Sequence, residues 1–200
     1  MTTSFYSIEE LKKLGINFNL SSPDSLSTIQ ISRKASLYSC SDITVSDHVR
    51  IDDFCILSGK INIGHNVHIS AYSSLFAGSA GIEIRDYVSI SSRCAIYGKS
   101  DDYSGAYMTN PTIPDEYKNV ISQKVIFEMF TLVGSGCTIL PGVTIHEGTS
   151  VGCMSLINKD LDAWGIYVGI PCRRIRDRKK DMLRYVTQYE SKYRNCSVRH

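Results

Sequence analysis

Two adjacent carboxylates, Asp101 and Asp102, are the residues of this sequence best suited to accept a proton. They lie in the run Ser-Asp-Asp-Tyr-Ser-Gly at residues 100–105. A carboxylate can act as a general base when it lies within about 3 Å of the group that it deprotonates. It remains a weak base unless burial raises its pKa. His65 is the second candidate for the base, although a histidine in its setting is more often a surface residue.

The two carboxylates lie in a segment that interrupts a repeat of six residues. This repeat predicts the secondary structure that must position the two carboxylates. Aliphatic residues or Phe stand at positions 45, 51, 57, 63, 69 and 75, then at 84, 90 and 96, and again at 127, 133, 139, 145, 151 and 157. A helix would repeat at about 3.6 residues and a strand at 2. A sustained period of six favours a parallel β-helix, in which each hexad forms one side of a triangular coil.

A second position of each hexad, four residues after the first, should also point into the coil. Small or modest side chains occupy it: Val49, Cys55, Ile61, Val67, Ser73, Ser79, Val88, Cys94, Cys137, Val143, Thr149 and Ser155. Larger residues would overfill the narrow interior, at a cost of roughly 1–3 kcal/mol per site. The fold is therefore predicted to be mainly β.

The chain divides into three parts around this repeat. Residues 1–28 form a lead-in with a short helix, for which Ser7 and Glu10 make a capping box and Gly15 a C-cap. Residues 29–161 form the coils, with an inserted loop at 98–124 that breaks every hexad. Such a long loop in a compact domain is usually functional or disordered, and its tyrosines and prolines favour order. Residues 162–200 form an extension with an α-helix from Ile175 to about Tyr193.

The composition narrows the possible partners. The net charge is +2, so no strong field toward nucleic acid or a membrane surface is expected. No apolar run approaches the roughly 18–20 residues of a membrane span, and the first residues do not resemble a secretory signal. The seven cysteines are odd in number and include no C-x-x-C pair. Several of them stand at inward hexad positions, which suits reduced cysteines in a protein core and predicts a cytoplasmic protein. Without a C-x-x-C pair, no zinc-cysteine site is expected.

Two motifs near the end of the coils carry a family resemblance. They are Ile-Leu-Pro-Gly-Val-Thr-Ile-His-Glu-Gly-Thr-Ser-Val-Gly-Cys-Met-Ser-Leu-Ile-Asn-Lys-Asp at 139–160 and Val-Gly-Ile-Pro-Cys-Arg-Arg-Ile-Arg at 168–176. With the hexads and the loop, they resemble the coenzyme A-dependent hexapeptide-repeat acyltransferases, which include the galactoside and maltose acetyltransferases. The resemblance implies a left-handed parallel β-helix, acetyl-CoA as co-substrate without a metal, and a homotrimer that binds coenzyme A between neighbouring subunits.

The resemblance also implies which residues contact coenzyme A. Ser135 and Cys153 match positions that line the pantetheine arm, and Asn158 and Lys159 match a pair near the adenosine. Arg173 and Arg176 match two arginines that meet the phosphates. Arg is suited to this task because its guanidinium offers a bidentate, permanently charged fork.

The sequence departs from the sugar O-acetylating relatives at the catalytic base. Those enzymes usually carry a His in the loop, whereas residues 98–124 contain none. A deprotonated amine is already a strong nucleophile, while a sugar hydroxyl needs more assistance. The difference favours N-acetylation over the alternative, sugar O-acetylation. A γ-type carbonic anhydrase, which needs three converging histidines, and a non-catalytic scaffold are less well supported.

The loop and the N-terminal run Ser-Phe-Tyr-Ser-Ile-Glu-Glu-Leu are similar to one subset of the family. This subset acetylates thymidine diphosphate-linked 4-amino-4,6-dideoxyglucose for O-antigen and lipopolysaccharide synthesis. The nucleotide sugar would then bind beside the loop, with Tyr103, Tyr107 and Asn110 as candidate contacts. An aromatic ring can stack on a base, but these tyrosines could equally pack the loop on the coils.

Overall fold

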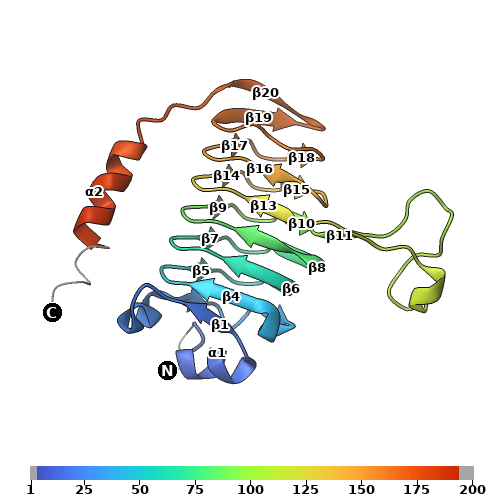
Figure 1. Cartoon of the computed structure of the whole chain (residues 1–200), viewed down its shortest axis with the longest axis horizontal. Coiled ribbons are helices and arrows are strands. Elements are labelled where there is room, and N and C mark those ends of the chain that lie inside the picture. Colours follow the sequence, from blue (N-terminus) through green and yellow to red (C-terminus); the bar gives the residue numbers. More distant parts are fainter. Residues whose placement is uncertain (1–3, 194–200) are drawn as a thin grey trace.

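Short parallel strands stack along the axis of a triangular solenoid (Figure 1). The structure is a computed structural model that describes residues 4–193. Consecutive coils pair in register, as in Ile51 with Ile69 and Ile69 with Ile90. The predicted parallel β-helix is confirmed.

We name the three faces of the solenoid A, B and C. Face A contains β3 (Ser36–Tyr38), β10 (Ala95–Tyr97), β15 (Thr138–Ile139) and β18 (Leu156–Ile157). Face B contains β1 (Asn17–Asn19), β4 (Ile43–Ser46), β13 (Val125–Phe127) and β16 (Thr144–Ile145). Two long strands, β6 (Ile56–Ile63) and β8 (Ser74–Ile84), run through both faces. Face C contains β2 (Gln30–Ile31), β5 (Arg50–Ile51), β7 (His68–Ile69), β9 (Ser89–Ile90), β14 (Leu132–Val133), β17 (Ser150–Val151) and β19 (Gly165–Gly169).

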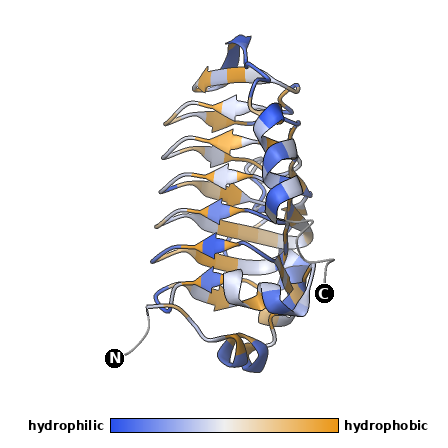
Figure 2. Cartoon of the chain, turned by 90° about the vertical axis from the view of Figure 1, so that its left-hand side faces the viewer, coloured by the Kyte–Doolittle hydropathy of each residue, from blue (hydrophilic) through white to orange (hydrophobic). Residues whose placement is uncertain are grey.

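The core is the column of inward side chains predicted from the hexads. Hydrophobic residues recur along the strands of successive coils (Figure 2). Eleven of the twelve residues expected at the second inward position are buried, and the exception is Ser79. The prediction for Ser79 was wrong because the register of β6 and β8 shifts around Gly59. Ile82, which pairs with Ile61, fills the interior there instead.

The corners between the faces place the residues discussed below. The first corner joins faces C and A, the second joins A and B, and the third joins B and C. Left-handed backbone marks the first corner at Phe54, Tyr72, Arg93, Gly136 and Met154. The same conformation marks the third corner at His48, Asn66, Tyr87, Phe130 and Gly148. Bulky residues such as Phe54, Tyr72 and Tyr87 adopt it uncommonly.

Helices lie at both ends of the described chain. The capping box of α1 (Ile8–Leu14) is confirmed, since Ser7 Oγ accepts from the Glu10 N–H (3.2 Å) and the Ser7 N–H donates to Glu10 (2.7 Å). Gly15 ends this helix with φ of 90°. Short 3-10 turns η1 (Pro23–Thr28) and η2 (Cys40–Asp42) follow.

The C-terminal helix begins later than predicted. Helix α2 spans Leu183–Tyr193, whereas Ile175 lies in strand β20 (Cys172–Asp177) and is 57% exposed. The prediction that the helix starts at Ile175 was wrong because this segment pairs antiparallel with β19. Parallel pairing along face C continues to β19, beyond the predicted end of the coils at residue 161. No helix within residues 4–193 is long and apolar enough to cross a membrane.

Helix α2 covers the third corner, on the opposite side of the solenoid from the projecting loop (Figure 1). Tyr189 donates its hydroxyl to Asn66 (2.9 Å) and meets the Tyr87 ring edge-on. The Tyr87 hydroxyl donates to Glu190 (2.7 Å). The third corner therefore has a cover within the same chain.

Candidate active site

The loop of residues 98–124 leaves the solenoid at the second corner through a tight neck. Strands β11 (Lys99–Ser100) and β12 (Ile121–Ser122) pair antiparallel, and the Gln123 N–H donates to the Gly98 carbonyl (2.9 Å). Only glycine fits at position 98, because a Cβ there would lie 2.2 Å from the Ala77 carbonyl oxygen. This close approach fixes where the loop starts, and the 3-10 turn η3 (Asp115–Tyr117) lies farther out.

Replacing Gly98 with Ala should therefore destabilise the neck. The added methyl group would push backbone against backbone, and we expect a loss of about 3 kcal/mol in the free energy of unfolding, measured by urea denaturation. Gly105→Ala is the control, because nothing lies within 4 Å of its added Cβ and only its φ of +82° is strained. We expect about 1 kcal/mol there. An equal or smaller loss in Gly98→Ala would contradict the steric argument.

The two loop carboxylates have different surroundings. Asp102 accepts hydrogen bonds from the Ser104 N–H (3.0 Å), the Ser104 hydroxyl (2.8 Å) and the Tyr107 N–H (3.2 Å). The bonds from Ser104, with that from Tyr107, hold the pKa of Asp102 below its ordinary value. Its carboxylate is committed to forming the loop turn, which leaves it poorly suited to receive a proton.

Asp101 faces a groove instead. Its carboxylate receives one long hydrogen bond from the Asn110 N–H (3.4 Å), and it forms no salt bridge with any residue of the described chain. The groove has a volume of about 1030 Å³ between the loop and face A. The stacked rings of Phe76 and Tyr97, with centroids 5.7 Å apart, form part of its wall. Of the two carboxylates, Asp101 is thus the one open to a bound molecule.

The candidate substrate contacts are only partly brought together. Tyr103 and Asn110 line the groove with Asp101, whereas Tyr107 does not. Tyr103 is 94% exposed, and Asn110 uses its side-chain oxygen to accept from the Thr112 N–H (2.9 Å) and hydroxyl (2.6 Å). The loop side of the groove is therefore largely uncovered in the single chain.

Several residues that line the groove were not predicted from the sequence. Phe76 and Tyr97 are outward residues of adjacent coils, each directly after an inward aliphatic residue. Large aromatics at that hexad position, one coil before the loop, were a usable signal. Lys118 also lines the groove, where it is nearly buried and pairs with Asp115 (2.9 Å), but nothing in the loop sequence distinguished it.

The candidate coenzyme A residues occupy two different corners. Ser135 lies at the first corner, where its hydroxyl accepts from that of Ser92 (3.3 Å), and the exposed Cys153 lies one coil farther. Asn158 and Lys159 are exposed at the second corner. The pairing of β15 with β18 sets this pair one coil above Leu140 and Pro141, which line the groove.

Arg173 and Arg176 are exposed in β20 near the C-terminal end of the solenoid. Neither forms a salt bridge with another side chain among residues 4–193. Arg174, between them, instead pairs with Asp177 (2.9 Å) and lies over the Tyr167 ring. The strand thus presents two guanidinium groups that remain available to an anion.

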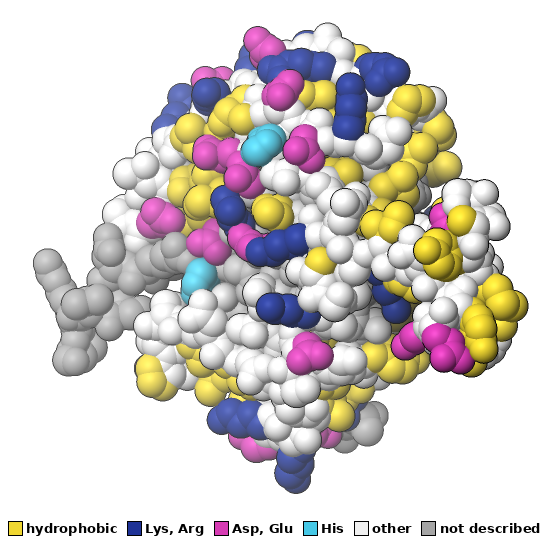
Figure 3. All heavy atoms as spheres, turned by 45° about the vertical axis from the view of Figure 1, so that its right-hand side comes forward, with side chains coloured by type: hydrophobic (Ala, Val, Ile, Leu, Met, Phe, Trp, Pro, Cys, Tyr) yellow, Lys and Arg dark blue, Asp and Glu magenta, His cyan; other side chains and the backbone are white. Residues whose placement is uncertain are grey.

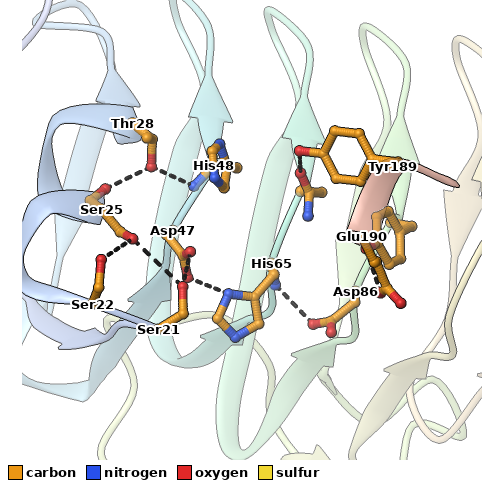
Figure 4. Close-up of polar contacts among 12 residues, drawn as sticks. Ser21, Ser22, Ser25, Thr28, Asp47, His48, His65, Asp86, Tyr189 and Glu190 are labelled. Carbon is orange, nitrogen blue, oxygen red and sulfur yellow. Dashed lines mark hydrogen bonds and ion pairs between the residues drawn. The ribbon is translucent and has the colours of Figure 1, made fainter. Parts of the chain in front are cut away.

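His65 lies at the third corner, where its ring points toward Asp47 (Figure 4). Its Nδ1 contacts the buried Asp47, and its backbone N–H donates to Asp86 (2.8 Å). Burial opposes ionisation of Asp47, but a hydrogen bond from the Ser21 hydroxyl and the pairing with His65 help to outweigh it and hold the pKa of Asp47 below its ordinary value. The structure does not bring His65 together with Asp101. Within the described residues, no three His, Cys, Asp or Glu side chains are grouped to hold a metal ion.

Comparisons with known proteins agree with this architecture. No family model matches the sequence. The chain is 42% identical over 158 residues to a dTDP-4-amino-4,6-dideoxy-D-glucose acyltransferase from Escherichia coli, covering 78% of this chain and 82% of that protein. It is 26% identical over 137 residues to a putative lipopolysaccharide biosynthesis O-acetyl transferase of Escherichia coli K12, covering 64% and 65%.

Solved structures of acyltransferases are also similar to this chain. AntD, an N-acyltransferase from Bacillus cereus, superimposes with a TM-score of 0.89 at 44% identity, covering 96% of this chain and all of that one. AntD is in complex with dTDP and 3-hydroxybutyryl-CoA, and a variant of it with dTDP-4-amino-4,6-dideoxyglucose and coenzyme A. A hexapeptide-repeat acetyltransferase from Vibrio cholerae shares the fold, with a TM-score of 0.58 at 19% identity and 86% and 76% coverage. This chain belongs to the acyltransferase family that includes the Escherichia coli dTDP-4-amino-4,6-dideoxy-D-glucose acyltransferase and AntD.

Proposed function

We propose that this protein transfers an acyl group from coenzyme A to the 4-amino group of dTDP-4-amino-4,6-dideoxyglucose. The acyl group predicted from the sequence is acetyl. The observation that carries the proposal is Asp101, an unpaired carboxylate on the wall of a groove beside the loop. Relatives that act on this amino sugar cover most of the chain, and the loop contains no histidine to activate a hydroxyl.

The mechanism is direct attack of the amine on the thioester carbonyl. Asp101 accepts the proton that the amine loses and passes it on to the departing sulfur, so that coenzyme A leaves as the thiol. Backbone N–H groups at a coil corner stabilise the oxyanion that forms on the carbonyl. Ser135 and Cys153 line the pantetheine arm, Asn158 and Lys159 lie near the adenosine, and Arg173 and Arg176 bind the phosphates.

The site is shared between subunits of a homotrimer. Ser135 and Cys153 lie at the first corner, whereas Asp101 and Lys159 lie at the second. The width of face A separates the corners by about 10 Å, the length of three strand residues. One coenzyme A molecule that runs parallel to the axis cannot contact both corners of one chain, but it can lie between the first corner of one chain and the second corner of its neighbour. Cyclic closure gives every subunit the same groove.

The exposed loop supports the same arrangement. It projects from the solenoid, and hydrophobic side chains gather on it (Figures 1 and 3). Tyr107, Met108, Tyr117, Val120 and Ile121 each expose more than 40% of their surface in the single chain. Exposed apolar side chains grouped in this way mark an interaction site, and the neighbouring subunit is the partner that completes the groove.

The cellular role follows from the substrate. We place the reaction in the cytoplasm, since the six cysteines of the described chain are all free thiols, as is usual in a reducing compartment. The acylated nucleotide sugar would then serve O-antigen or other surface polysaccharide synthesis. The likeness to a putative lipopolysaccharide biosynthesis transferase supports this role.

The decisive assay measures thiol release from acetyl-CoA with two acceptors, dTDP-4-amino-4,6-dideoxyglucose and its 4-hydroxy counterpart. We expect free coenzyme A with the amine and at least about 100-fold less with the hydroxyl, because only the amine is a strong nucleophile near neutral pH. Equal release with both acceptors would favour O-acetylation. Release with neither, despite binding of acetyl-CoA, would refute the proposed substrate.

A further inference from the structure

Five successive coils place a thiol or a hydroxyl inside the solenoid, directly behind the first corner. Each of these side chains follows the residue with left-handed backbone, and all are buried: Cys55, Ser73, Cys94, Cys137 and Ser155. The equivalent positions behind the third corner carry Val49, Val67, Val88, Thr131 and Thr149. Because valine fills this position in three coils of the third corner, packing alone does not require a polar group there. The thiols and hydroxyls behind the first corner therefore have a role besides filling the core.

Four of these five groups donate a hydrogen bond to the backbone of the next coil. Each bond ends on the carbonyl of the residue that directly follows a strand of face C. The pairs are Cys55 with Ser70 (3.2 Å), Ser73 with Ser91 (3.0 Å), Cys94 with Gly134 (3.2 Å) and Cys137 with Gly152 (3.2 Å). At the third corner, Thr149 alone makes such a bond, to the Asp162 carbonyl (2.9 Å), whereas the Thr131 hydroxyl has no partner among the described residues. The core thus holds a row of carbonyl groups of the first corner inward.

An inward carbonyl turns the following N–H outward, because a trans peptide bond is planar. Within residues 4–193, only the bond between Ile170 and Pro171 is cis. The N–H groups that follow the four carbonyls belong to Ala71, Ser92, Ser135 and Cys153, and none of them donates to another residue of the described chain. At the third corner, by contrast, the equivalent N–H of His65 donates to the Asp86 carboxylate (2.8 Å; Figure 4). The first corner therefore presents a row of free, outward donors.

The N–H of Ser135 lies at the level of the proposed reaction. The coil of Ser135 continues through β15 to Leu140, which lines the same groove as Asp101. Rotation about a three-fold axis parallel to the solenoid keeps each coil at its level, so this N–H comes opposite the Asp101 of a neighbouring chain. Cys153 lies one coil closer to Arg173 than Ser135 does. Of the two residues proposed to line the pantetheine arm, Ser135 is thus the one nearer the thioester.

We propose that Cys94 is a positioning residue for acyl transfer. This inference rests on the proposed function. The Cys94 thiol holds the Gly134 carbonyl inward and so keeps the Ser135 N–H directed at the thioester oxygen. That oxygen becomes negative when the amine attacks, and a donor fixed in advance stabilises it without reorganisation. Cys94 is 1% exposed, so it acts through the peptide group and contacts no substrate itself.

Replacing Cys94 with Ala should lower kcat about tenfold, less than the roughly 100- to 1000-fold cost of removing an oxyanion donor outright. The effect is smaller because the N–H remains and loses only its fixed orientation. The KM values for acetyl-CoA and the amino sugar should stay within about twofold, the pattern of an interaction made in the transition state. Cys94→Val, a second variant without a donor, should behave as Cys94→Ala does. Cys94→Ser should restore kcat to within about twofold, because serine occupies this position at Ser73 and Ser155.

Cys137→Ala is the matched control, since it removes the same thiol from the next coil. The Gly152 carbonyl also accepts from the Ser155 hydroxyl (2.8 Å) and stays held without Cys137. The Gly134 carbonyl has no second donor within residues 4–193. Cys137→Ala should therefore keep kcat within about twofold, while both Ala variants unfold at similar urea concentrations.

Three results would overturn the role of Cys94: full turnover in Cys94→Ala, turnover in Cys94→Ser as slow as in Cys94→Ala, or an equal loss in Cys137→Ala. The last two would mean that the thiols only fill the core. Absence of transfer to the amino sugar in the unaltered protein would instead refute the proposed function.

Discussion

Replacing Asp101 with Asn should lower the turnover number for the amino sugar at least about 100-fold, the lower range for loss of a general base. The amide keeps the size of the carboxylate and can still accept the hydrogen bond from the Asn110 N–H. It cannot take up the proton that the attacking amine releases. The KM for acyl-CoA should stay within about twofold, since Asp101 does not contact this co-substrate in the proposed arrangement. Steady-state kinetics with each substrate varied in turn measures both effects.

Asp102→Asn is the matched control, because it removes the same charge from the neighbouring position. Asn can still accept hydrogen bonds from the Ser104 and Tyr107 N–H groups that Asp102 now receives. We therefore expect less than about a tenfold change in turnover. A larger loss in Asp102→Asn than in Asp101→Asn would exchange the roles of the two residues. Near-normal turnover in both variants would mean that no loop carboxylate acts as base.

The fold could be predicted from the sequence because a β-helix is a local repeat. The same two positions of each hexad point inward, and this pattern recurs in the next hexad. The prediction failed where pairing was not local. The segment from Ile175 was expected to belong to the C-terminal helix, yet residues 172–177 form a strand because β19 offers them a free edge. Ser79 fits its hexad, but the register shift of β6 against β8 moves it outward.

The candidate site was less predictable, for a physical reason. Asp101 and Asp102 are the same residue type side by side, and only the loop conformation decides which one accepts three local hydrogen bonds. The pattern Asp-Tyr-Ser does allow an Asx turn at Asp102, so part of this distinction was available in advance. The groove residues from the coils, such as Phe76, were signalled in the sequence only as large outward aromatics close to the loop, and the corner from which the loop leaves places them in the groove.

Replacing Arg173 with Ala should raise the KM for acetyl-CoA about 10- to 100-fold, the equivalent of 1.5–3 kcal/mol for a hydrogen-bonded charge pair. The KM for the amino sugar should stay within about twofold. The reason is that Arg173 has no salt-bridge partner in the described chain, so its guanidinium is free to bind a phosphate. Dephospho-CoA, which lacks the 3′-phosphate, serves as a second probe. If the arginine meets that phosphate, the variant should lose the preference for coenzyme A over dephospho-CoA.

Arg174→Ala controls for the loss of a positive charge from the same strand. Arg174 is paired with Asp177 and lies on Tyr167, so its removal should affect stability more than the KM for acetyl-CoA. A selective rise in the KM for the amino sugar in Arg173→Ala would contradict the cofactor assignment. An equal rise in the KM for acetyl-CoA in Arg173→Ala and Arg174→Ala would also contradict the cofactor assignment.

Asp101→Asn and Arg173→Ala together can test whether the site is shared between two subunits. Arg173 pairs with Val168 beside the first corner, whereas Asp101 enters from the second. If each groove takes Asp101 from one subunit and Arg173 from its neighbour, trimers formed from a mixture of Asp101→Asn and Arg173→Ala chains contain some grooves with both residues intact. Random mixing of equal amounts would restore about a quarter of the sites. Assayed at low acetyl-CoA, where each variant alone is nearly inactive, the mixture should recover activity after the subunits are dissociated and reassembled. In a site contained within one chain, every groove would carry one of the two substitutions, and mixing would restore nothing.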